Sequence, residues 1–102
     1  VLRGYVTSAG EPEPEQFFNG TRLRLPHFAS SIELTEARAK IIKFMWGTEG
    51  SAPPVLSWAE VNGAVTVNTG FQSFDDAFGG KAAREEVIEL VRRGKYRVRR
   101  NP

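Results

Sequence analysis

Cysteine is absent from the 102 residues of the chain, and there is only one histidine. Without cysteine there can be no disulfide, no thiolate metal ligand and no cysteine nucleophile. A Ser-His-Asp triad would depend entirely on His27, and no spacing of histidine and carboxylate is typical of a metal site. Gly79-Gly80-Lys81 lacks the other residues of a phosphate-binding loop. We therefore expect a non-catalytic protein with no cofactor and no metal, and keep an enzyme as the weaker alternative.

Long hydrophobic runs are also missing. No stretch is long enough to cross a bilayer, and no signal peptide is visible. With 40% apolar and 25% charged residues, the composition is that of an ordinary globular protein. These features predict one domain over residues 1–102, located in the cytoplasm, with no membrane partner.

Charge is spread unevenly along the chain. Residues 1–20 sum to −2, whereas residues 81–102 contain eight Lys or Arg and sum to +5. Such an asymmetry indicates an anionic partner near the C-terminal end, although a solubilising basic segment would have the same composition.

The stretch at residues 55–69 predicts a β-hairpin at the centre of the fold. Asn62-Gly63 separates two runs rich in Val, Trp and Thr, and this pair favours a type I′ turn. Because side chains alternate between the two faces of a strand, one face is apolar and the other is small and polar. The apolar face carries Leu56, Trp58, Val65 and Val67, and the open face carries Ser57, Ala59, Thr66 and Asn68.

Other segments have recognisable boundaries. Alternation at residues 21–26 predicts a strand with Leu23 and Leu25 inward, preceded by a tight turn at Asn19-Gly20. Thr35 and Gly47 predict the start and stop of a helix whose apolar stripe includes Ala37, Ile41, Phe44 and Met45. We also expect a short helical turn capped by Ser73, a helix at residues 81–93, and strands at residues 2–7 and 95–100. Residues 10–15, rich in Glu and Pro, predict a solvated turn.

From residue 21 onward this order resembles the ferredoxin-like βαββαβ sandwich, an α+β fold with two helices on one face of an antiparallel sheet. The resemblance is one of topology and covers about 80 residues. Residues 1–20 would add an N-terminal strand and an acidic, Pro-rich turn to a core at residues 21–102. In that fold the first and last strands are neighbours, so their arginines would share the helix-free face.

Two functions follow as hypotheses. The first is nucleic-acid binding through the phosphate backbone, because clustered arginines suit phosphate. Base stacking of the RNA-recognition-motif kind is disfavoured, since the central strands have no outward aromatics. The second is protein–protein interaction or homo-oligomeric assembly through a sheet edge or the open face defined above. The predicted nucleic-acid site consists of Arg22, Arg24, Arg92, Arg93, Lys95, Arg97, Arg99 and Arg100.

Overall fold

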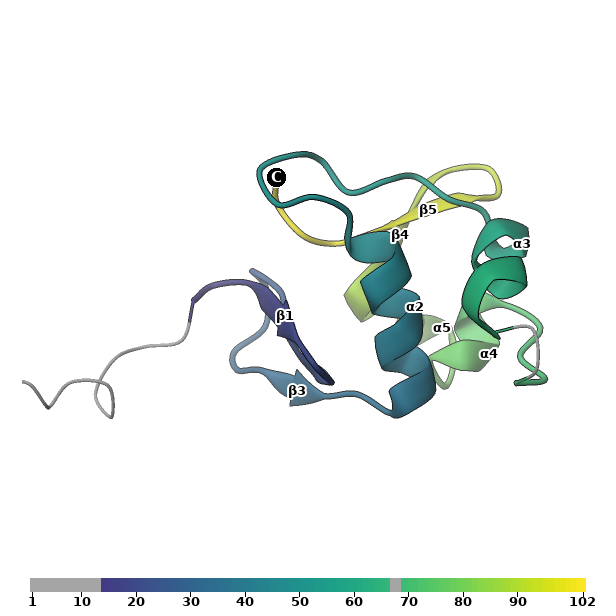
Figure 1. Cartoon of the computed structure of the whole chain (residues 1–102), viewed down its shortest axis with the longest axis horizontal. Helices are drawn as coiled ribbons and strands as arrows, with labels where there is room; N and C mark the ends of the chain where they lie inside the picture. Colours follow the sequence, from purple (N-terminus) through teal and green to yellow (C-terminus); the bar gives the residue numbers. More distant parts are fainter. Residues whose placement is uncertain (1–13, 67–68) are drawn as a thin grey trace, which may run out of the picture.

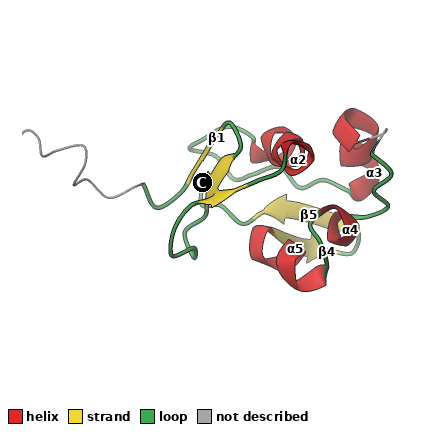
Figure 2. Ribbon diagram, turned by 90° about the horizontal axis from the view of Figure 1, so that it is seen from below, coloured by secondary structure: helices red, strands yellow, loops and turns green. Residues whose placement is uncertain are grey.

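Two separate antiparallel sheets and several helices make up the α+β domain seen in the computed structural model, which describes residues 14–66 and 69–102 (Figure 1). The first sheet has the order β1-β2-β3, with strands Phe17–Asn19, Arg22–Arg24 and Ile32–Glu33. The second pairs β4, Ile88–Arg92, with β5, Lys95–Val98. Figure 2 shows β1 well apart from the β4–β5 hairpin. The strand expected at residues 2–7 lies outside the described residues.

The first sheet confirms the alternation predicted for residues 21–26. Leu23 and Leu25 are fully buried, and β2 pairs with β1 through Phe18 and Leu23. Gly20, at φ 65°, makes the tight turn between these strands, a backbone conformation that glycine adopts at little cost. Strand β1 itself was not predicted.

Helix α2, Glu36–Trp46, confirms both predicted boundaries. The Thr35 side chain accepts a hydrogen bond from a backbone N–H of the first turn, and the helix ends at Gly47 with φ 74°. Ile41 and Met45 are fully buried as expected, whereas Phe44 is 41% exposed and does not belong to the buried stripe.

The hairpin expected at residues 55–69 is wrong, because most of this stretch is helical. Helix α3 is Trp58–Val61, and it continues into the π-helical segment η1, Asn62–Thr66. A capping box starts it: the Ser57 hydroxyl accepts from the Glu60 N–H, and the Glu60 carboxylate accepts from the Ser57 N–H. These two hydrogen bonds satisfy backbone N–H groups at the start of the helix, where no carbonyl of the helix itself can reach them. They favour a helix over the hairpin turn that Asn62-Gly63 would form.

In the last third of the chain, the helix is shorter than predicted and is followed by a β-hairpin. Helix α4, Phe74–Ala77, begins at the Ser73 cap as expected, and α5 is Lys81–Val87. The segment predicted to extend α5 to residue 93 instead forms β4, and β5 returns antiparallel to it. Ile88 and Val91 are β-branched and so favour a strand.

One apolar core joins the helices to both sheets. It contains Leu23, Leu25, Leu34, Ala39, Ile41, Ile42, Met45, Trp46, Val61, Phe74, Ala77, Phe78, Val87, Ile88 and Val98. Leu56 also pairs with Tyr96 through two backbone hydrogen bonds of 2.8 Å, so the segment before α3 adds a single bridge to β5. The ferredoxin-like arrangement is not confirmed, since β2 and β5 belong to different sheets.

Candidate nucleic-acid interface

The β4–β5 hairpin has one inward and one outward face. Tyr96 and Val98 point to the core, where Val98 is fully buried and Tyr96 packs against Phe74 with ring centroids 4.8 Å apart. Alternation then puts Lys95, Arg97 and Arg99 on the other side, as the sequence predicted.

Two carboxylates form ion pairs with the cationic side chains along β5. Glu89, directly opposite Arg97 in the hairpin register, accepts from the Arg97 Nε at 2.6 Å and lies 3.6 Å from Arg99 Nη1. The Lys95 ammonium donates to the Glu60 carboxylate at 3.0 Å. This ammonium, followed by the Ser57 N–H, lowers the pKa of Glu60 below its usual value.

The hairpin tip carries charge that these carboxylates do not reach. Arg92 pairs in register with Lys95, and Arg93 forms the turn with Gly94. Both arginines are exposed, and within residues 14–66 and 69–102 neither has a carboxylate oxygen within 4.0 Å. We call the following set the basic hairpin face: Arg92, Arg93, Lys95, Arg97 and Arg99. It presents five cationic side chains against two paired carboxylates.

Arg84 holds this hairpin against the helices from its inward side. The residue is only 5% exposed, and its Nε donates to the Asp75 carboxylate at 2.7 Å while Nη1 donates to the Ile88 carbonyl at 3.0 Å. Its guanidinium also lies 5.3 Å from the centre of the Tyr96 ring. One side chain therefore connects α4, the start of β4 and the middle of β5.

Arg100 is in the predicted site but has a structural position. It is 5% exposed, and its three nitrogens donate to the carbonyls of Trp46, Thr48 and Asn101 at 2.7 to 2.9 Å. The side chain thus caps the C-terminal end of α2, and its three nitrogens already have partners within the protein. It still adds positive charge to a groove of about 390 Å³ at the base of the hairpin, which His27, Arg97 and Arg99 also line.

Arg22 and Arg24 are not part of this surface, contrary to the prediction. They lie on β2 in the other sheet, where the Arg22 Nη1 donates to the Ser31 hydroxyl at 3.0 Å and its Nε lies 3.9 Å from Glu33. Arg24 is partly buried. The shared plane of arginines expected from the ferredoxin-like fold is therefore absent from the described residues.

The described residues of the predicted open face do not lie on a sheet either. Ser57 caps α3 and Ala59 lies within that helix. Thr66 is 1% exposed and donates to the Asn62 side chain at 2.8 Å. Asn68 lies outside the described residues. Ser57, Ala59 and Thr66 therefore do not form a sheet surface on which a partner could dock.

Comparisons with known proteins give no relative: no family model, curated protein or solved structure matches the chain. In the part of the chain that the structure describes, no cluster of His, Asp and Glu is arranged to hold a metal ion. None of the described helices is both long and apolar enough to span a membrane.

Proposed function

We propose that the protein binds nucleic acid through the phosphate backbone, using the basic hairpin face. The observation that carries the proposal is the excess of cations on one solvent-facing hairpin, with Arg92 and Arg93 at its tip away from any described carboxylate. Guanidinium groups suit phosphate because they donate two parallel hydrogen bonds and stay charged.

The order of elements supports the same proposal by analogy alone. Helix α2 is followed by the Leu56 bridge, then by α3, by α4 with α5, and by the hairpin. This is the order of a winged helix-turn-helix domain, in which a hairpin beside the helices contacts the nucleic-acid backbone. The exposed side of α5 carries Glu85 and Glu86, which phosphate would repel. We therefore propose that the hairpin contacts the nucleic acid, and we do not propose that α5 binds in a groove.

A salt series measures how many phosphates the protein neutralises, and variants of the hairpin show how many of them depend on it. Fluorescence anisotropy with a mixed-sequence duplex is followed from low to moderate salt, and the slope of log K against log [salt] gives that number. Replacing Arg92 and Arg93 by Gln should weaken binding to all sequences and reduce the slope by about 2. Sequence preference should not change, because backbone contacts do not read bases.

The matched control removes the same charge from a different surface. Lys40 and Lys43 are exposed on α2, and the K40Q/K43Q double variant has the same net charge as R92Q/R93Q. We expect the control to bind almost as tightly as the native chain. Equal losses in the two double variants would show that only net charge matters, and undetectable binding at low salt would overturn the proposal altogether.

Self-association through strand β4 is a second candidate function. Leu90 is 55% exposed and Val91 37% exposed on this strand, which pairs only with β5 in the described residues. An unpaired edge with apolar side chains is able to add a strand from another chain. Sedimentation equilibrium tests it: a mass that rises with concentration in the native protein but not in L90K supports assembly, and a constant monomer mass rejects it.

A further inference from the structure

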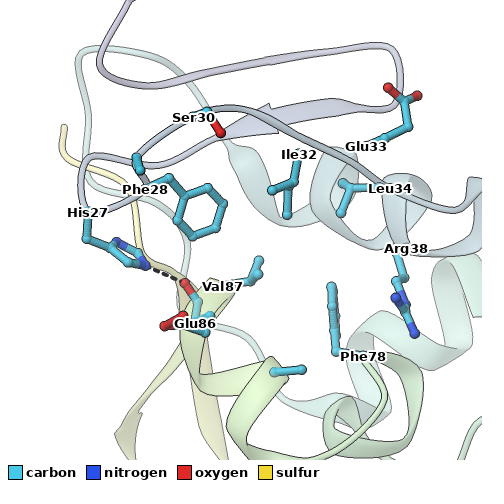
Figure 3. A pocket seen from close by; sticks show the side chains of 12 residues that line it. His27, Phe28, Ser30, Ile32, Glu33, Leu34, Arg38, Phe78, Glu86 and Val87 are labelled. Atoms are coloured by element: carbon cyan, nitrogen blue, oxygen red, sulfur yellow. Dashed lines mark hydrogen bonds between the residues drawn. The ribbon is translucent and has the colours of Figure 1, made fainter.

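A second cavity, with a largely apolar body, lies between the loop that follows β2 and helix α5 (Figure 3). His27 separates it from the groove at the base of the hairpin, since this residue lines both. Its volume is about 450 Å³, within the range of small-molecule sites in proteins. Phe28 and Phe78 line it from two sides, with Ile32, Leu34 and Val87 between them. Ile32 is 38% exposed although it belongs to a strand, so an apolar surface is left open to solvent here.

The ends of this cavity differ in charge. Arg38, on α2, lies beside Phe78 at the end opposite His27. Its Nε donates to the Ala77 carbonyl at 2.9 Å, and this bond fixes the direction of the guanidinium. No described carboxylate comes within 4.0 Å of Arg38, so the remaining N–H donors of this half-buried cation have no anion to pair with in residues 14–66 and 69–102.

The two glutamates in the lining do not neutralise Arg38. The Glu33 side chain points away from the cavity and is held by the Thr21 hydroxyl and Arg22. Glu86 lies at the His27 end, where its backbone carbonyl accepts from the His27 Nε2 at 2.6 Å. The cavity therefore has an apolar body with two aromatic walls and one cationic end.

We infer that this cavity binds a small aryl carboxylate, with its ring between Phe28 and Phe78 and its carboxylate on Arg38. The apolar walls supply affinity by burying the ring, and the guanidinium supplies selectivity for an anion. The inference does not depend on nucleic-acid binding, because no residue of the basic hairpin face lines this cavity.

The test compares two ligands of nearly the same shape, the anionic 2-naphthylacetate and the neutral 2-naphthylacetamide, by isothermal titration calorimetry. The native protein should bind the carboxylate about five- to tenfold more tightly than the amide. The R38Q variant should lose this preference, whereas K43Q, which removes a cation from the same helix outside the cavity, should keep it.

A cavity-filling variant and chemical-shift mapping locate the site independently of Arg38. In A83F the new ring enters the cavity from the exposed start of α5, and both ligands should lose most of their affinity. In the native protein, the amide signals of Phe28, Leu34 and Val87 should shift on titration. Equal affinity for the two ligands, no binding of either, full binding to A83F, or shifts confined to other residues would each overturn the inference.

Discussion

Replacing Arg84 should loosen the hairpin and destabilise the whole domain. In R84M the apolar stem is kept, but the Ile88 carbonyl loses its buried donor and Asp75 loses its charged partner. A buried acceptor left unsatisfied costs about 1–3 kcal/mol, and a hydrogen bond to a charged group contributes about 1.5–3 kcal/mol. The second figure is discounted here, because the Asp75 side chain is 44% exposed and water replaces part of the interaction. We expect a loss of about 3 kcal/mol.

Urea unfolding followed by far-UV circular dichroism measures this loss, and D75N provides the comparison. For a domain of this size about 3 kcal/mol corresponds to a fall in Tm of roughly 15 °C. D75N should cost about 1 kcal/mol, because Arg84 keeps its bond to Ile88 and its place over Tyr96. The two losses should not be additive in the double variant, since both remove the same contact. A cost for R84M within 0.5 kcal/mol of zero, or strict additivity, would refute the role given to Arg84.

Three further predictions concern α2, α3 and the hairpin. S57A removes the capping box and should lower the unfolding free energy by about 1 kcal/mol in urea titrations, whereas A59S in the same helix should change it little. G47A should cost more than 1 kcal/mol, since the position has φ 74° and an added Cβ would lie 2.6 Å from Pro54 Cδ; an unchanged Tm contradicts this. K95M should raise the pKa of Glu60 in a carboxyl NMR titration. Because the folded-state pKa of Glu60 is lowered, its contribution to stability is present above the unfolded-state value and is lost as pH falls through the folded-state value; an identical Glu60 titration in both proteins counts against the pair.

Local signals in the sequence predicted the elements that depend on local chemistry. Thr35 and Gly47 mark the ends of α2, and Ser73 marks the start of α4, because caps satisfy donors and acceptors within a few residues of themselves. Alternation likewise gave the faces of β2 and β5, with Leu23 and Val98 fully buried.

The central segment was misread because two local signals compete there. Asn62-Gly63 favours a hairpin turn, while Ser57 followed by Glu60 three residues later is the pattern of a capping box. The pattern was visible in the sequence and could have corrected the prediction. Asn62 has φ −61° and ψ −43°, so the pair that favoured a turn is helical instead.

The parts of the fold that could not be predicted from the sequence depend on long-range contacts. The run from Ile88 to Val91 is compatible with a helix or a strand, and pairing with β5 decides it. Which strands are neighbours also depends on distant residues, so the grouping of Arg22 with Arg97 failed although both strands are present within, and shorter than, their predicted bounds. The basic residues of the hairpin were all predicted, whereas the cavity at Arg38 brings together distant segments that no motif connects.

The bridge between Leu56 and Tyr96 sets how a force on the hairpin is transmitted. Apart from side-chain packing, two backbone hydrogen bonds join β5 to the segment that leads into α3. Any tilt of the hairpin toward a bound polymer must therefore either break both bonds together or carry α3 with it. The amide hydrogens of these two residues should consequently exchange with solvent at matching rates, as a single opening event, while those at the hairpin tip exchange freely.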